Sequence, residues 1–168
     1  MSERDHEGRA SVQIVDLAAY GFERVGAWVL SDDYANHLSH LPGITYELDA
    51  SSRRLRHVVY AFTFDEDLAY VGETAALDGL CSRFDGYRSG QKYAADTDNH
   101  VKAGITRALQ GKRDVGIWCV CPIAHLELPD GTVSGLHGHK VLEAYMIERH
   151  APPLNKHNSE RRRESSSA

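Results

Sequence analysis

The sequence predicts an α+β fold in which helices flank a small antiparallel sheet of about three strands. Residues 57–72 contain two runs rich in β-branched and aromatic residues on either side of an acidic turn, which is typical of a β-hairpin. Further along, three segments carry apolar residues at helical spacing, and a short apolar strand lies between the second and the third. Two strands, two helices, a strand and a helix in this order indicate the α+β class.

Length and composition are those of one ordinary domain, with 168 residues, of which 42% are hydrophobic and 26% charged. No apolar run approaches the roughly 18 residues that would span a bilayer. Residues 1–10 are charged and precede no apolar signal segment, so we expect a cytoplasmic protein without membrane association. Cys119 and Cys121 alternate in a strand-like run, which favours buried thiols over a disulfide or zinc site.

The N-terminal third predicts few elements. Residues 1–10 are expected to be mobile, residues 15–20 to form a short helical stretch, and residues 24–30 and 44–50 to form strands. We interpret residues 1–56 as an extension that contacts DNA or a second subunit.

In the hairpin, the side chains of one strand alternate between the two faces of the sheet. If Phe64 pairs with Leu68 across a three-residue acidic turn, Tyr60 lies opposite Gly72, and Tyr60 and Tyr70 share a face. Gly72 has no Cβ, so another group can approach the backbone there. Two strand tyrosines taken alone are more often packing residues than functional ones.

The remaining elements follow from apolar spacing and from breakers. A polar, glycine-rich stretch at 85–100 predicts a long loop, and 128–138 predicts a turn region with an Asp-Gly pair. The third helix should end before Pro152 and Pro153, because proline cannot continue a helix. The predicted helices lie around 77–84, 101–109 and 142–149, the strand at 115–123, and a disordered tail at 158–168.

Several polar residues lie on these predicted elements in an order and spacing that can be compared with known families. Tyr60 ends "VVY", Tyr70 begins "YVG", Arg83 lies in "LCSRFDGY", and Glu143 and Asn155 lie in "LEAYMIERHAPPLN". In order and spacing, residues 57–157 resemble the GIY-YIG nucleases, in which two short strands precede a helix with an arginine, and a glutamate and an asparagine follow. Residues 57–157 would then be the catalytic core.

The resemblance implies hydrolysis of a phosphodiester, which needs an activated water and positive charge at the phosphoryl oxygens. Glu143 would bind Mg²⁺, which Mn²⁺ could replace, and Arg83 would hold the phosphate. Tyr60 would orient or deprotonate the water, and Tyr70 would hold the water or the phosphate. Asn155 would anchor Glu143 or the end of its helix.

Two positions depart from the family pattern. Four residues after the arginine, many members carry a histidine, whereas this chain carries Tyr87, which could still hydrogen-bond water or phosphate. After the glycine, some members carry lysine or serine, whereas this chain carries Glu73. The general base is therefore open among Tyr60, Tyr70, Tyr87 and Glu73, and we choose Tyr60.

Two histidines lie near the predicted metal ligand. His139 precedes Glu143 by one helical turn, and His137 is close in sequence, so a transition-metal site of nitrogen and oxygen ligands is an alternative. Stabilisation of the helix start is the favoured interpretation of His139.

Basic residues are unevenly distributed in a chain with a net charge of −5. Seven basic and three acidic side chains lie between positions 82 and 113, and Arg53, Arg54 and Arg56 form a second basic group. Either set could face phosphates or simply be solvated. The residues predicted to contact DNA are Arg88, Gln91, Lys92, Asn99 and Lys102.

The function that fits best is a type II restriction endonuclease that acts on double-stranded DNA. It would be a homodimer if its site is palindromic, because one active site cuts one strand. A methyltransferase that modifies the same site would be its partner. The alternatives are a structure-selective nuclease of repair or of a mobile element, and a DNA-binding module without catalysis.

Overall fold

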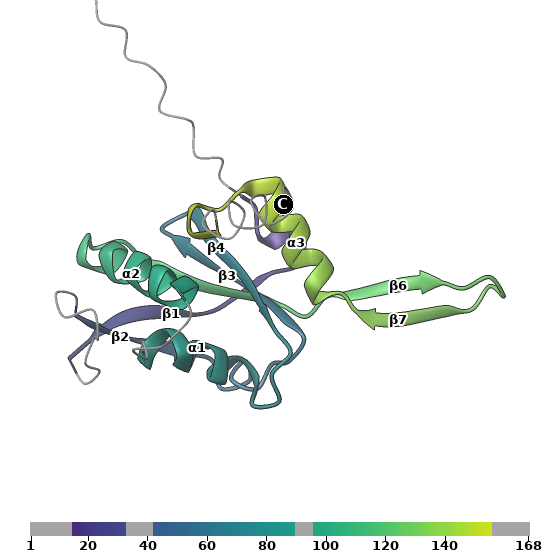
Figure 1. Cartoon of the computed structure of the whole chain (residues 1–168), viewed down its shortest axis with the longest axis horizontal. Coiled ribbons are helices and arrows are strands. Elements are labelled where there is room, and N and C mark those ends of the chain that lie inside the picture. The colour runs from purple at the N-terminus through teal and green to yellow at the C-terminus, as the bar shows by residue number, and fades with distance from the viewer. Residues whose placement is uncertain (1–14, 33–41, 90–95, 156–168) are drawn as a thin grey trace, which may run out of the picture.

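A computed structural model describes residues 15–32, 42–89 and 96–155 of the chain (Figure 1). Its strands are β1 (Glu23–Ser31), β2 (Gly43–Leu48), β3 (Val58–Phe64), β4 (Asp67–Thr74), β5 (Val115–Val120), β6 (Ile123–Glu127) and β7 (Val133–His137). Its helices are α1 (Gly79–Ser89), α2 (Asp96–Gln110) and α3 (His139–His150), with short 3₁₀ turns η1 (Ala18–Tyr20) and η2 (Pro153–Asn155).

The main sheet has five antiparallel strands in the order β2-β1-β5-β3-β4. Its two faces are covered by different elements: α1 and α2 pack with one apolar cluster, and α3 with the other. Strands β6 and β7, which follow β5 and precede α3 in the sequence, form a separate two-stranded ribbon that projects away from this body (Figure 1). In the described part of the chain, no helix is long and apolar enough to cross a membrane.

Strand β3 is buried on both faces, which explains its nearly continuous apolar sequence. Tyr60 and Phe62 point into the cluster beneath α1 and α2, whereas Val59 and Ala61 pack on the side of α3. All four are fully buried. A strand between two covered faces needs apolar side chains at both parities.

The sheet is larger than predicted, because residues 23–48 contribute two strands to it. Trp28 of β1 and Ile44 of β2 lie in the same buried cluster as the hairpin. The indole of Trp28 makes an edge contact with Phe62, with ring centroids 5.7 Å apart. The expectation of about three strands was wrong, because segments distant in sequence share one apolar face with the hairpin.

The predicted hairpin register is confirmed at the two positions that matter for the tyrosines. Tyr60 lies opposite Gly72, and Phe62 lies opposite Tyr70. Tyr60 and Tyr70 therefore share a face, and their ring centroids are 6.2 Å apart.

The turn itself differs from the prediction. Phe64 pairs with Asp67 rather than Leu68, so only two residues form the turn. An irregularity in the pairing leaves Ala69 as an extra residue on β4, which restores the register beyond it. Asp65 takes a φ of 55°, which a short polar side chain tolerates in a tight turn.

The predicted long loop at 85–100 was also wrong. Helix α1 extends through Ser89 because Tyr87 is fully buried on its inner face, and α2 already begins at Asp96. Leu77, predicted as the first apolar position of α1, is 80% exposed and precedes the helix. All three cysteines are free, but Cys121 is exposed rather than buried.

Candidate active site

Three tyrosine hydroxyls meet at one point of the molecule. The Tyr87 hydroxyl lies 2.9 Å from that of Tyr60 and donates to that of Tyr70 at 3.2 Å. The three rings come from β3, β4 and α1 and are at most 4% exposed. We call Tyr60, Tyr70 and Tyr87 the phenol cluster.

The guanidinium of Arg83 binds this cluster. Its Nε donates to the Tyr60 hydroxyl at 3.0 Å, and its Nη2 donates to the Tyr87 hydroxyl at 2.7 Å. Arg83 and Tyr87 are four residues apart on α1, so both lie on one helix face. The structure thus brings together four of the predicted catalytic residues.

Asp98 completes the surroundings of Arg83 and was missed in the sequence analysis. Its Oδ1 accepts from Nη2 of Arg83 at 2.9 Å, and its Oδ2 accepts from Nη1 at 3.2 Å. The two side chains are 28% and 16% exposed. Asp98 lies in a stretch that was interpreted as loop, and no local pattern links it to an arginine on another helix.

Gly72 is required by the cluster. A Cβ built on Gly72 would lie 2.6 Å from the Tyr60 hydroxyl oxygen. The close approach expected at this glycine is therefore made by Tyr60 itself, the residue opposite it in the hairpin.

Burial dominates the acidity of the phenols. Burial raises the pKa of Tyr60 well above its ordinary value, the charge of Tyr70 adds to the rise, and Arg83 opposes it. Burial likewise raises the pKa of Tyr87. In the free protein these hydroxyls are neutral, so the positive charge of Arg83 alone does not produce a phenolate.

Glu143, the predicted metal ligand, lies half-buried on α3. Burial raises the pKa of Tyr70, and the negative charge of Glu143 adds to the rise. Helix α3 packs against β4, the strand that carries Tyr70.

Asn155 acts as a clamp on the sheet edge. Its Oδ1 accepts from the Val71 N–H at 2.9 Å, and its Nδ2 donates to the Val71 carbonyl at 2.8 Å. Strand β4 is the last strand of the sheet, so Asn155 takes the place of a further strand at Val71. The contact holds the segment after α3 against the strand that carries Tyr70.

Glu73 points away from the phenol cluster toward a group of histidines. Its Oε2 lies 3.5 Å from Nε2 of His139, which is buried at the start of α3. The rings of His57 and His137 stack, with centroids 3.8 Å apart and planes within 4° of parallel. Among the described residues, no group of three or more His, Cys, Asp or Glu is arranged to hold a metal ion.

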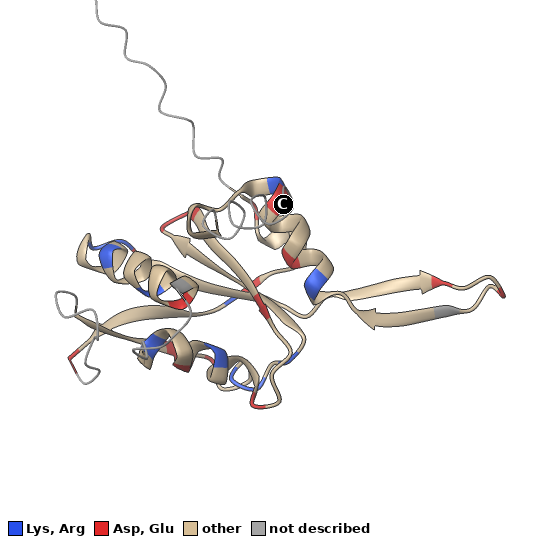
Figure 2. Cartoon of the chain, in the orientation of Figure 1, with Lys and Arg blue, Asp and Glu red and all other residues tan. Residues whose placement is uncertain are grey.

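The residues predicted to contact DNA differ in their exposure and in their partners. Lys102 is only 1% exposed, and its Nζ donates to the Arg88 carbonyl at 2.8 Å, so a phosphate contact by Lys102 does not fit the structure. Arg88 pairs with Asp85 at 3.0 Å, and Asn99 is half-buried on α2. Gln91 and Lys92 lie outside the described residues. Figure 2 shows basic segments on both α1 and α2, next to acidic ones.

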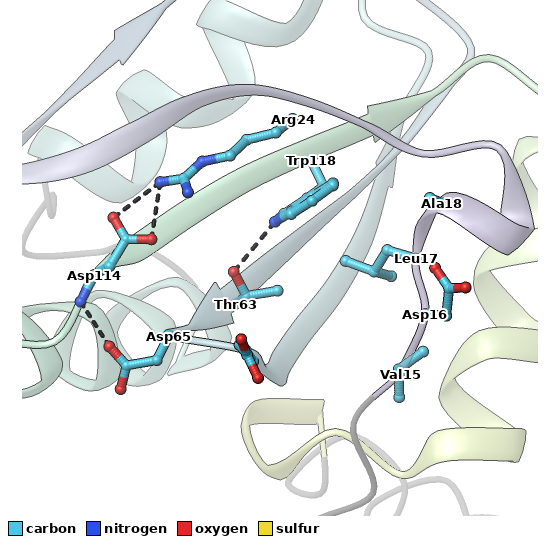
Figure 3. A pocket seen from close by; sticks show the side chains of 10 residues that line it. Val15, Asp16, Leu17, Ala18, Arg24, Thr63, Asp65, Asp114 and Trp118 are labelled. Carbon is cyan, nitrogen blue, oxygen red and sulfur yellow. Dashed lines mark hydrogen bonds and ion pairs between the residues drawn. The ribbon is translucent and has the colours of Figure 1, made fainter.

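A separate cavity of about 580 Å³ lies beside β1, β3 and β5 (Figure 3). Arg24 binds both carboxylate oxygens of Asp114 at 2.8 Å there, and Trp118 donates to Thr63. No residue of the phenol cluster lines it, and its four carboxylates disfavour a phosphate. The residues that line it are Val15, Asp16, Leu17, Ala18, Arg24, Thr63, Asp65, Glu66, Asp114 and Trp118.

Comparison with known proteins adds information at the level of the fold. No protein-family model matches the sequence, and no curated protein matches it. The structure is similar to that of a mutant of EndoII from bacteriophage T4, with a TM-score of 0.56 and 21% sequence identity over 82% of this chain and 94% of that one. The restriction endonuclease HPY188I in complex with product DNA is also similar, with a TM-score of 0.46 and 16% identity over 81% of this chain and 80% of that one. This chain and EndoII therefore share a fold.

Proposed function

We propose that this protein is a metal-dependent DNA endonuclease, and specifically a site-specific enzyme of the type II restriction class. The observation that carries the proposal is the contact of Arg83 with the buried hydroxyls of Tyr60 and Tyr87, at 3.0 and 2.7 Å. The permanent positive charge of an arginine is suited to binding the phosphoryl oxygens of a phosphodiester, and the neighbouring hydroxyls could orient a water for attack on it. The fold shared with EndoII, a phage endonuclease, and the resemblance to GIY-YIG nucleases support the same activity.

Arg83 would neutralise the charge that builds up on the phosphoryl oxygens during attack. Its position is fixed from one side by the phenol cluster, so the guanidinium needs little reorganisation in the transition state. A lysine could not reproduce this, because it lacks the planar fork of N–H donors.

Tyr60 would act on the attacking water, as general base or as the group that orients it. Because burial keeps Tyr60 neutral in the free protein, it could accept a proton only after losing its own. Its hydrogen bond with Tyr87, which in turn donates to Tyr70, links the three hydroxyls, so a proton that leaves Tyr60 along this chain would displace the Tyr87 proton to Tyr70 and the Tyr70 proton to bulk water.

Glu143 would hold the metal. A single half-buried carboxylate near the phenol cluster fits Mg²⁺, which is usually bound through one or two carboxylates and keeps several waters, and Mn²⁺ could replace it. When bound, the ion would supply positive charge to the phosphoryl oxygens and lower the pKa of a water that it holds. Asn155 would keep α3 in place through its contact with Val71.

A restriction role further implies a homodimer on a palindromic site and a methyltransferase that protects the same site. One copy carries one phenol cluster, and one such site cuts one strand. Size-exclusion chromatography with and without duplex DNA tests the dimer.

The activity is tested with supercoiled plasmid and Mg²⁺, with chelator as control. We expect discrete linear fragments from the wild type and none from Glu143→Gln or Arg83→Ala. Nicking without fixed fragments would indicate a nuclease without sequence selectivity, and binding without cleavage would indicate a DNA-binding module. Full activity of Glu143→Gln would disprove the assignment of the metal ligand.

A further inference from the structure

The guanidinium of Arg83 is held by protein groups along two edges. Nε and Nη2 face the hydroxyls of Tyr60 and Tyr87, whereas Nη1 and Nη2 face the two carboxylate oxygens of Asp98. These contacts use four of the five N–H groups that an arginine offers. Each edge that could grip a phosphate with two parallel hydrogen bonds is therefore already occupied.

The two edges differ in how readily they can be opened. Tyr60 and Tyr87 are fully buried and packed among other aromatic rings, so their hydroxyls cannot leave the guanidinium without loss of core packing. Asp98 is the third residue of α2, partly exposed, and could release Arg83 by a side-chain rotation. A phosphate that takes two bonds from Arg83 would approach on the Asp98 edge.

A carboxylate and a phosphodiester compete for such an edge. Both present two oxygens to the planar fork of an arginine in the same geometry. Both are negatively charged, so they repel each other in a site where the surrounding protein lowers the dielectric constant. Simultaneous binding of both on the Nη1 and Nη2 atoms is excluded by geometry and by charge.

We propose that Asp98 occupies the place of the substrate phosphate on Arg83 in the free enzyme, and that DNA binding exchanges this carboxylate for a phosphodiester. The inference rests on the proposed nuclease function. Asp98 is then a residue that sets affinity and specificity. Weak encounters with DNA do not release enough free energy to displace it, whereas a complex with its full set of contacts does.

Asp85 offers a matched control in the same region. It also lies on the helical surface and also pairs with an arginine, Arg88, at 3.0 Å. It also accepts from the hydroxyl of Tyr46 at 2.7 Å, whereas the carboxylate that pairs with Arg83 is that of Asp98. Asp85→Asn removes one negative charge near the proposed DNA surface, as Asp98→Asn does, but leaves the Arg83 fork unchanged.

The experiment measures the affinity of a short random-sequence duplex in chelator, where no metal supports cleavage. We expect Asp98→Asn to bind about tenfold more tightly than wild type, because a like-charge contact is removed and a donor edge is freed. Asp85→Asn should change affinity by about twofold or less, because a half-exposed ion pair such as Asp85–Arg88 contributes little free energy. In an Arg83→Ala background, the gain from Asp98→Asn should shrink to that of Asp85→Asn.

Two results would overturn the inference while leaving the nuclease function intact. Cleavage by the wild type together with unchanged or weaker binding by Asp98→Asn would mean that Asp98 only positions Arg83. Equal gains from Asp98→Asn and Asp85→Asn would mean that any nearby charge matters. A wild type that neither binds nor cleaves DNA would overturn the function and the inference together.

A measurement on the wild type avoids dependence on any variant. In a structure of the wild-type protein with an uncleaved duplex, Asp98 should be released from both Nη atoms and a phosphate should take its place. Retention of both Asp98 bonds in that complex would contradict the proposal even if Asp98→Asn proved unstable.

Discussion

The two hairpins of the molecule are built from the same local elements and have opposite surroundings. The β3–β4 hairpin lies in the main sheet and is covered on both faces, whereas the β6–β7 ribbon projects from the body (Figure 1). In the first, Tyr60 and Phe62 are fully buried; in the second, Leu126 and Leu136 are about half exposed, at 49% and 51%.

This difference explains why the candidate site is on the first hairpin. Catalytic groups need side chains whose rotamers are fixed by packing. Tyr60 is held by Phe62, Phe84 and Tyr87 through ring contacts, and its hydroxyl is fixed over Gly72. The ribbon offers no comparable constraint, because an isolated two-stranded ribbon is itself only marginally stable.

The largest expected contrast is in stability. Phe62→Ala should lower the free energy of unfolding by about 3–5 kcal/mol, because it leaves a cavity in the main core. The matched change Leu136→Ala on β7 should cost about 0.5 kcal/mol or less, because half of that side chain is already in water. Urea unfolding of both variants measures the difference, and similar losses would show that the ribbon is packed in solution.

The next contrast concerns chemistry. Tyr60→Phe removes one hydroxyl and should lower the cleavage rate by at least about 10²-fold, the lower range for a positioned acid–base group, while duplex binding and fold persist. Tyr145→Phe on α3, at a residue that is 49% exposed, should leave the rate unchanged. If Tyr60→Phe lowered the cleavage rate by less than about tenfold and Glu73→Gln lowered it by more, Glu73 would be the general base instead.

Glycines in the second strand of each hairpin give a third test. Gly72→Ala places a methyl group 2.6 Å from the Tyr60 hydroxyl oxygen and should destabilise the protein by about 1–3 kcal/mol while displacing that hydroxyl. Gly135→Ala on β7 meets only the Ile123 side chain, at 3.4 Å, and should be tolerated. Thermal unfolding and plasmid cleavage report the two effects, and an active, stable Gly72→Ala variant would show that the hydroxyl is not confined.

The parts of this site that sequence could predict are local. The hairpin parity of Tyr60 and Tyr70 follows from the backbone period of a strand, and the structure bears it out. Tyr87, in contrast, was predicted in a loop, and its place one helical turn after Arg83 on α1 is seen only in the structure. The role of Asp98 could not be predicted, because its partner lies on another helix, 15 residues away in sequence.

The burial of polar residues and the pairing of distant strands could not be predicted from the sequence either. Lysine is typically a surface residue, yet Lys102 is buried, and its ammonium group donates to the Arg88 carbonyl. Strand β1 was predicted from its sequence, but its membership in the main sheet depends on packing of Trp28 against Phe62, far along the chain. Such pairings are set by tertiary packing, which overrides local propensity.

The smallest expected effect lies where the two hairpins meet. His57 immediately precedes β3, and its ring stacks on that of His137, the last residue of β7, at 3.8 Å. Burial lowers the pKa of His57 below its ordinary value of 6.5, and His137, His139 and Arg56 lower it further, while Glu73 opposes them. Protonation would place positive charge against this stack.

Because the pKa of His57 is lower in the folded than in the unfolded chain, the unfolded chain binds the proton more readily. The free energy of unfolding should therefore fall as pH drops through 6.5 and level off below the folded pKa. His57 has a φ of 52°, so asparagine is the replacement that best tolerates its backbone conformation. Urea unfolding between about pH 7.5 and about pH 5.5 should show a smaller loss for His57→Asn than for wild type, since the carboxylates contribute equally to both. Identical pH dependence in the two proteins would show that the stacked histidines do not couple the ribbon to the β3–β4 hairpin.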